Sequence, residues 1–203
     1  MIDSSENRIL AGAFQLFLEY SYEKVSTSLL EEKIGLTRGA IFYYSKNKNQ
    51  LFRDVINKYV LEKQDVKNKM SSINIERVTL LEFLNTYIDC AQKNINSMRC
   101  LVNDESKAYG AYFRLLYQAQ LNYEGFSELI TQKFEEERSL LDQVVKYAIE
   151  RGEIKQELNP AELARHIRYI FIGNSFEESL KVGFKIEEAR SLILSYYNLI
   201  KNE

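Results

Sequence analysis

The segment TRGAIFYYSKNK, residues 37–48, gathers side chains that suit contact with a nucleic acid. It combines a hydroxyl, a guanidinium, two very small residues, three aromatic rings and two lysines. A guanidinium fork matches the O6 and N7 atoms of guanine, and hydroxyl and ammonium groups bond phosphate oxygens. Very small residues allow a helix to approach another surface closely. We therefore interpret this segment as one that lies against a nucleic acid.

No other part of the sequence offers a comparable set of chemical groups. The acidic run FEEERSLLDQ at 134–143 has no nucleophile or base beside it, and its consecutive glutamates point to different sides of a helix. The lone His166 and the pair Cys90 and Cys100 lack metal-ligand spacing. We expect no enzyme, metal or cofactor, two reduced cysteines that act as small buried hydrophobes, and a structural or ligand-contacting histidine.

The charge is distributed unevenly along the chain. The net charge is −2, but residues 35–60 hold five Lys/Arg against a single Asp. A local basic patch on a slightly acidic body can attract a polyanion at that patch alone. No apolar run approaches the roughly 18 residues of a membrane helix, and the N-terminus MIDSSENRIL lacks a signal core, so we expect a cytoplasmic protein without membrane contact.

Apolar residues recur at helical spacing along nearly the whole chain, and no strict alternation long enough for a sheet occurs. Gly152 and Pro160 bound a clear break, because glycine suits a helix end and proline a helix start. The pattern predicts an all-α fold of about nine helices, at 4–20, 27–34, 38–44, 48–70, 76–98, 104–122, 124–151, 160–182 and 186–202.

Two of the predicted helices are short and separated by the sequence EKIGLTRG. Gly35 can adopt the left-handed conformation that ends a helix, and Thr37 can cap the next one. The spacing of nearby apolar residues fits the contacts of a helix-turn-helix with a preceding helix. These residues are Leu30, Ile34, Leu36, Ile41 and Tyr44.

The stretch from residue 8 to 52 resembles the N-terminal domain of the TetR (tetracycline repressor) family of transcriptional regulators. The similar parts are ILAGAFQLF as a first helix, VSTSLLEEKIGLTRGAIFYY as the helix-turn-helix, and KNKNQLF leading into a long fourth helix. The resemblance implies a helix-turn-helix DNA-binding domain at 1–47 and a larger helical ligand-binding and dimerisation domain at 48–203.

In such a motif the second helix enters the major groove with its first turn facing the base edges. Arg38 is the expected base reader, Gly39 and Ala40 permit close approach, and by resemblance Tyr43 faces the sugar-phosphate chain. Tyr44 is expected to pack inward and offer only its hydroxyl. The predicted DNA contacts are Thr27, Ser28, Thr37, Arg38, Gly39, Ala40, Tyr43, Tyr44 and Lys48.

Three positions depart from the family pattern. Glu31 stands where a small residue is usual, Phe42 where a tyrosine is usual, and Ser45 where a bulky apolar residue usually packs beneath the recognition helix. We expect Glu31 to lie at the edge of the helix pair with its carboxylate reaching water, since a buried carboxylate without a partner is costly.

The helical body is rich in aromatic residues, which suits a pocket for a small, largely apolar or aromatic effector, although most such rings simply fill a core. The predicted pocket residues are Tyr87, Tyr109, Tyr112, Phe113, Tyr117, Phe134, Tyr147, His166 and Tyr169. The last two helices have broad apolar faces that either form a four-helix dimer interface or close the core of their own chain. The predicted interface residues are Ile167, Ile170, Phe171, Leu192, Ile193, Tyr196, Leu199 and Ile200.

The leading functional hypothesis is a homodimeric repressor that binds double-stranded DNA at a palindromic operator and is released by a small-molecule effector. Activation instead of repression stays open, because the sequence does not reveal the direction of regulation. The alternative is a helical interaction protein that acts through protein partners and has only non-specific affinity for DNA. A helical enzyme is disfavoured by the lack of catalytic groups.

Overall fold

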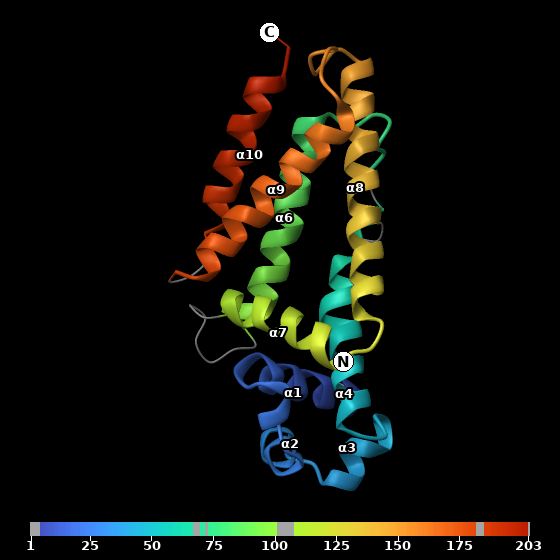
Figure 1. Ribbon diagram of the computed structural model, residues 1–203, viewed down its shortest axis with the longest axis vertical. Helices are drawn as coiled ribbons and strands as arrows, with labels where there is room; N and C mark the ends of the chain where they lie inside the picture. Colours follow the sequence, from blue (N-terminus) through green and yellow to red (C-terminus); the bar gives the residue numbers. More distant parts are fainter. Residues whose placement is uncertain (1–4, 67–69, 72, 101–107, 182–184, 203) are drawn as a thin grey trace. The chain divides into compact units, whose positions relative to one another are not determined.

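The computed structural model describes residues 5–66, 70–71, 73–100, 108–181 and 185–202, without the side chains of residues 108 and 109. These ranges are all-α, as predicted. The α-helices are α1 (Ser5–Glu19), α2 (Thr27–Ile34), α3 (Arg38–Tyr44), α4 (Lys48–Ile56), α6 (Leu80–Arg99), α7 (Ala108–Asn122), α8 (Phe126–Glu150), α9 (Pro160–Ser179) and α10 (Ile186–Ile200) (Figure 1).

The predicted helix at 48–70 is wrong beyond its first part. α4 ends at Ile56. The chain then forms a π-helical turn, η2 (Asn57–Leu61), and a 3-10 turn, η3 (Glu62–Gln64). A further 3-10 turn, η1 (Tyr22–Lys24), was not predicted. Residues 4, 67–69, 104–107 and 182, which fall within predicted helices, lie outside the described residues.

Local capping sets two boundaries that the apolar spacing misplaced. α6 begins at Leu80 instead of residue 76, because Thr79 and Glu82 cap each other: the Thr79 Oγ1 accepts from the Glu82 N–H at 3.1 Å, and the Glu82 carboxylate accepts from the Thr79 N–H at 3.1 Å. α8 begins at Phe126 because Gly125 has a φ of 85°. The predicted break at Gly152 and Pro160 is confirmed, with φ 73° at Gly152 and Pro160 opening α9.

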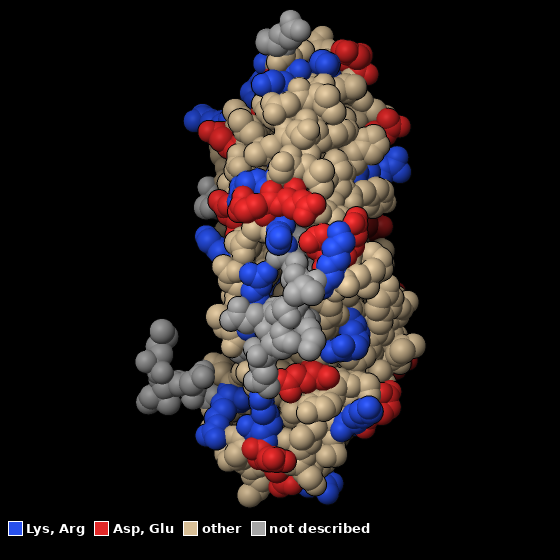
Figure 2. Space-filling model, turned by 90° about the vertical axis from the view of Figure 1, so that its left-hand side faces the viewer, with Lys and Arg blue, Asp and Glu red and all other residues tan. Residues whose placement is uncertain are grey.

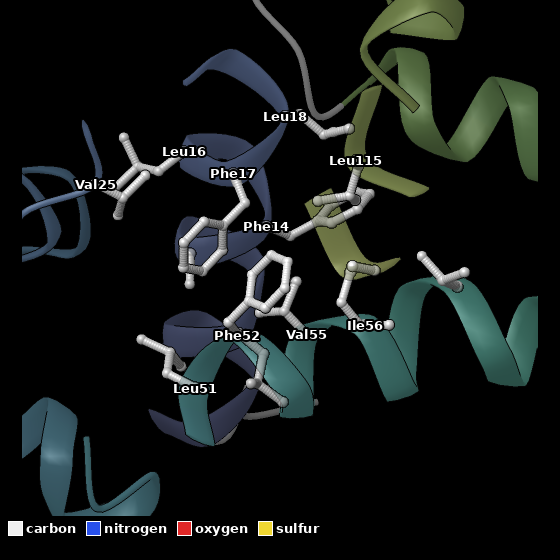
Figure 3. Packing of buried hydrophobic residues seen from close by; sticks show 14 of the residues in the cluster. Phe14, Leu16, Phe17, Leu18, Val25, Leu51, Phe52, Val55, Ile56 and Leu115 are labelled. Atoms are coloured by element: carbon white, nitrogen blue, oxygen red, sulfur yellow. The ribbon is translucent and has the colours of Figure 1, made fainter. Parts of the chain in front are cut away.

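The chain forms two compact units, and both α6 and α8 contribute residues to each of them. The first unit comprises Met1–Gln64 and Ser97–Thr131. Its core joins α1, α4 and α7, where Phe14, Phe17 and Phe52 are fully buried (Figure 3). The Phe17 and Phe52 rings meet edge to face at 4.8 Å, and Phe14 stacks on Tyr59 at 4.2 Å. α7 is therefore part of the same core as the N-terminal helices.

Polar contacts also fasten α7 and the turn after it to the N-terminal helices. Arg114 donates to the carbonyl of Leu18 at the end of α1. The Asn49 amide donates to the carbonyl of Asn122 at 3.3 Å. The Tyr123 hydroxyl donates to Asn57 Oδ1 at 3.0 Å. The first unit is thus held by both apolar packing and hydrogen bonds.

The second unit comprises Asp65–Asn96 and Gln132–Glu203, with α6, α8, α9 and α10 as its main helices. Glu153, just after α8, ties three of its segments together: its carboxylate accepts from the N–H groups of Leu80 and Leu81 at 3.0 and 3.2 Å and from the Tyr197 hydroxyl at 3.2 Å. Burial, reinforced by this carboxylate, raises the pKa of the Tyr197 phenol.

The two cysteines are free thiols, but neither is buried as expected: Cys90 is half-buried and Cys100 exposed. None of the helices in the described ranges is long and apolar enough to cross a membrane.

Candidate nucleic-acid interface

α2 and α3 form a helix-turn-helix whose turn has the predicted geometry. Gly35 is left-handed at φ 68°, and its N–H donates to the Glu31 carbonyl at 2.8 Å. The Thr37 hydroxyl caps α3 by accepting from the Ala40 N–H at 3.4 Å. The cap of α2 is Ser26, whose hydroxyl accepts from the Leu29 N–H at 3.2 Å. These caps define where each short helix starts and stops.

One side of the motif is buried against α1. Leu30, Ile34 and Ile41 are buried, and Leu36 and Phe42 pack partly against the same core. α1 and α2 are in close contact at Gly12, where an added Cβ would lie 2.7 Å from Ile34 Cγ1. This packing orients α3 so that its opposite side is left to solvent.

The solvent side of α3 carries most of the predicted DNA-contacting residues. We call the exposed residues Thr37, Arg38, Gly39 and Tyr43 the recognition face. An added Cβ at Gly39 would meet nothing within 4 Å, so the backbone itself is open there. Tyr43 is 83% exposed, and Ala40 beside it is half-buried. The structure thus brings a cation, a hydroxyl, an open backbone and a ring to one surface.

Tyr44 does not pack inward as expected. Its side chain is 47% exposed, and its ring meets the Tyr43 ring edge to face at 5.3 Å. The short helix explains this position, because α3 ends at Tyr44 and no later turn covers it. Of the predicted residues on α2, Ser28 is exposed and Thr27 half-buried.

The five lysines and arginines of residues 35–60 are divided between two environments. Arg38 and Lys46 are exposed. Lys48 instead donates to the Tyr22 carbonyl at 3.1 Å and lies 4.3 Å from the centre of the Tyr22 ring. Arg53 donates to the Glu124 carbonyl at 3.2 Å, and Lys58 to Asn7 Oδ1 at 2.5 Å. Three of the five cations therefore take part in contacts within the first unit, which charge counting along the sequence could not detect.

The departures from the family pattern have specific partners. Ser45 is buried, and its hydroxyl donates to Asp54 Oδ2 at 2.7 Å, while Gln50 Nε2 donates to Asp54 Oδ1 at 2.8 Å. A polar group thus replaces apolar packing beneath α3. Glu31 is partly exposed, as expected, and its carboxylate accepts from the Arg38 N–H at 2.6 Å.

The predicted effector residues are divided between the two compact units. Tyr112, Phe113 and Tyr117 belong to the first unit, and the Tyr109 side chain lies outside the described residues. Tyr117 and Tyr169 are about 60% exposed, at 61% and 59%. The other predicted residues, all in the second unit, are Tyr87, Phe134, Tyr147 and His166.

Within the second unit, a polar and aromatic cluster joins α6, α8 and α9. The Tyr87 hydroxyl donates to Glu137, and Arg168 Nε donates to the other Glu137 oxygen at 3.3 Å. The Arg168 guanidinium lies 4.4 Å from the centre of the Phe134 ring, and Tyr87 meets Phe171 edge to face at 5.6 Å. The sequence analysis named Tyr87 and Phe134 as pocket residues but gave no role to Glu137 or Arg168, which the structure brings into contact with them.

His166 lies outside this cluster. It is exposed, and its Nδ1 is 2.8 Å from the Tyr196 hydroxyl on α10. Burial raises the pKa of the Tyr196 phenol, which keeps it neutral and able to donate. This pair links α9 to α10 and agrees with the structural role that the sequence allowed for the histidine.

The predicted dimer residues separate into two groups. Ile167, Phe171, Ile193 and Ile200 are buried within the single chain, so they serve its own core instead of a partner. Exposed apolar residues lie on the other side of the same two helices. We call this second group the α9–α10 face; it comprises Tyr169, Ile172, Phe176, Leu180, Leu192 and Leu199.

α10 is on the side of Figure 1 that faces the viewer in Figure 2, and the upper part of Figure 2 shows an area without charged side chains. At the end of α9, beside Leu180, Lys181 pairs with Glu177 and Glu178. Ile170 and Tyr196 are half-buried at the margin of the α9–α10 face. Helical spacing alone missed Tyr169, Ile172 and Phe176 as members because it could not tell which side of α9 meets the core.

Comparison with known proteins supports this description. The sequence profile of the bacterial regulatory proteins of the tetR family matches residues 9–55. The HTH-type transcriptional repressor AcnR of Corynebacterium jeikeium is 49% identical over 47 residues, which are 23% of this chain and 25% of that protein. The matched segment therefore spans about a quarter of that relative.

Similarity in fold extends much further along the chain. A TetR transcription regulator from Haloarcula marismortui superimposes with a TM-score of 0.73 over 99% of this chain and 100% of that one, at 17% identity. A transcriptional regulator from Saccharomonospora viridis, solved in complex with choline, has a TM-score of 0.73 over 99% and 100%, at 13% identity. Residues 9–55 of this chain therefore match the N-terminal domain of the tetR family of bacterial regulatory proteins, and the fold of the chain is similar to that of the two solved regulators.

Proposed function

We propose that this protein is a ligand-responsive transcriptional repressor that binds a palindromic operator as a homodimer. The observation that supports it most strongly is that one side of α3 is buried while its opposite side is exposed. Ile41 is fully buried, whereas Arg38 and Gly39 beside it are exposed, with open space around Gly39. An exposed first turn of this kind suits insertion into a major groove, which is about 12 Å wide. We assign residues 1–47 to the DNA-binding domain and 48–203 to the effector and dimer domain.

Each contact residue has a distinct proposed role. Arg38 reads guanine, and Ala40 and Gly39 allow the backbone to approach the base edges. Thr37, Tyr43, Tyr44, Thr27 and Ser28 bond the sugar-phosphate chain and fix the register. Lys48 uses one of its three ammonium protons for the Tyr22 carbonyl, so another is available to a phosphate.

We infer that two chains pair through the α9–α10 face. Support comes from the side-by-side exposure of apolar residues on both helices, including Leu180 at 74% and Leu199 at 69%. Exposed apolar groups in a row mark protein–protein contacts. A two-fold axis would present two recognition faces to half-sites about 34–36 Å apart, which is one helical turn of DNA.

We propose that the effector binds in the second unit near the cluster around Glu137. Rings from Tyr87, Phe134 and Phe171 offer apolar contact to a small aromatic or apolar molecule. On α9, the hydroxyl of Ser175 is fully buried and has no hydrogen-bond partner among the described residues. Such a group is costly to leave unpaired, so a polar atom of the effector is a suitable partner. The choline complex of the Saccharomonospora viridis regulator supports small-molecule binding by a protein of this fold.

Release from DNA would follow from different affinities of the effector for two arrangements of the dimer. A ligand that binds the non-DNA arrangement better shifts the population towards it. A ligand that binds both arrangements equally would change nothing, however tightly it binds.

Fluorescence anisotropy with two labelled duplexes tests the proposal. One duplex carries a palindrome found upstream of the protein's own or an adjacent gene, and the other has the same base composition in scrambled order. We expect tighter binding to the palindrome, with a stoichiometry of two chains per duplex. Equal, weak affinity for both duplexes would favour the alternative function through protein partners.

Two substitutions separate specific from general contacts in this assay. R38A should reduce the preference for the palindrome over the scrambled duplex. K48A should weaken binding to both duplexes alike and lower the slope of log affinity against log salt by about one. If neither substitution affects binding, the assigned contact surface is wrong.

A further inference from the structure

Glu31 makes two separate hydrogen bonds at the turn between α2 and α3. Its backbone carbonyl accepts from the Gly35 N–H at 2.8 Å and so closes the left-handed turn. Its side-chain Oε1 accepts from the Arg38 N–H at 2.6 Å, a length typical of charge-assisted hydrogen bonds. One residue therefore holds both the start and the end of the turn that leads into α3.

The second bond acts on the residue expected to read the operator. Arg38 is the first residue of α3, and the first N–H groups of a helix have no partner within the helix. Glu31 takes the N–H of Arg38, and Thr37 takes the N–H of Ala40 at 3.4 Å. The first turn of α3 is therefore anchored on both sides of the exposed Gly39 before any DNA is bound.

The carboxylate also places a negative charge beside the residue expected to enter the groove. This charge repels the phosphate oxygens of any DNA sequence. Base edges carry no net charge and are repelled much less.

We propose that Glu31 is a positioning residue that raises sequence specificity. Its carboxylate fixes the backbone from which the Arg38 side chain extends, and its negative charge repels phosphate groups of any sequence. This inference rests on the proposed DNA-binding function. It assigns a role to a position where a small residue is usual in proteins that this sequence resembles.

The test measures binding of E31A and E31Q to the palindromic and scrambled duplexes. E31A removes both the acceptor and the charge, so affinity for the palindrome should fall about tenfold, the effect of a lost helix cap, and affinity for the scrambled duplex should rise. E31Q retains an acceptor for the Arg38 N–H, so affinity for the palindrome should stay near that of the native protein while affinity for the scrambled duplex rises.

The neighbouring Glu32 provides a matched control. It is exposed on the same helix, and E32A removes the same charge without touching Arg38. E32A should leave the ratio of the two affinities within about twofold of the native value. If E32A lowers the ratio as much as E31A does, general charge explains the effect and the proposal fails.

A double substitution distinguishes positioning of Arg38 from a general effect on folding. In the R38A background, E31A should cause no further loss of affinity for the palindrome, because the side chain that it positions is already gone. An equal loss in both backgrounds would overturn the proposal. Circular dichroism checks that each variant is folded, and if E31A is not, E31Q carries the test: an unchanged affinity for the scrambled duplex would then refute the role of the charge.

These outcomes are separable from a failure of the proposed function. If the native protein does not distinguish the palindrome from the scrambled duplex, the operator-binding function itself is wrong. If the native protein distinguishes them and E31A retains the same ratio, only the role of Glu31 is wrong.

Discussion

The recognition face and the α9–α10 face are both exposed, but the first is mainly polar and charged and the second is apolar. The recognition face has a cation, a hydroxyl and an open glycine, with Tyr43 as its single large ring. The α9–α10 face has only large apolar or aromatic side chains, such as Leu180 and Leu199. A polyanion is bound by donors and charge, whereas another protein chain is bound by apolar area removed from water. The difference indicates two partners of different chemistry for the two faces.

The largest effect is expected from charges placed in the α9–α10 face. The double variant L180E/L199E should be a monomer in analytical ultracentrifugation. It should also bind the operator at least about 100-fold more weakly, because two linked DNA-binding domains bind much more tightly than one.

The matched control for this change is L121E on α7. Leu121 is 83% exposed but lies outside the α9–α10 face, so its substitution should leave a dimer with native operator affinity. A dimer that survives L180E/L199E would show that the chains pair through another surface.

A smaller effect is expected at the recognition face. R38A should weaken palindrome binding by about 10- to 100-fold, corresponding to the loss of one bidentate base contact, while the protein remains dimeric. K33A removes an exposed cation from the neighbouring helix α2 and should change the affinity by less than about threefold. Comparable losses in both variants would mean that general charge, not base reading, dominates binding.

Substitutions of two glycines in the N-terminal helices separate effects on packing from effects on DNA contact. G12A should lower the free energy of unfolding by about 1–3 kcal/mol, because the new methyl group would lie 2.7 Å from Ile34 Cγ1. G39A should leave stability unchanged or slightly higher, since its methyl group meets nothing within 4 Å, but it should weaken DNA binding by obstructing close approach. Thermal unfolding and anisotropy measure the two effects separately, and native DNA binding by G39A would contradict the close approach.

The smallest effects are expected on stability, from substitutions of two buried serines. S45A should destabilise the protein by about 1 kcal/mol, because Asp54 loses the hydrogen bond from the serine hydroxyl. S175A should be neutral or stabilising in the absence of effector, since its hydroxyl has no partner among the described residues. Chemical denaturation checks both, and a destabilising S175A would show that the hydroxyl already has a role in the free protein.

Much of the fold and of the exposed surface of α3 could be predicted because local signals determine them. Gly35, Thr37 and the apolar spacing of α2 and α3 act over a few residues, so the helix-turn-helix was correctly located. The start of α6 was missed although Thr79 and Glu82 form a recognisable capping pair. The end of α4 at Ile56 could not be predicted, because apolar spacing continues through the π-helical turn that follows.

Orientation across helices was not predictable in the same way. Ile167 and Ile193 were predicted to face a partner but are buried in their own chain, while Phe176 on the same helix as Ile167 is exposed. An amphipathic pattern shows that a face is apolar but not what covers it. The cations Lys48, Arg53 and Lys58 likewise found partners far away in the sequence.

The sequence by itself determined the helical class, the turn at Gly35 and the residues of the recognition face, because capping, backbone preference and helical spacing act between close neighbours in the chain. Only the tertiary structure decided which apolar residues of α9 and α10 remain exposed, which lysines and arginines stay available to a polyanion, and that Glu31 bonds the Arg38 N–H. Those outcomes depend on which helices pack together, and packing joins residues that the order of the chain keeps apart.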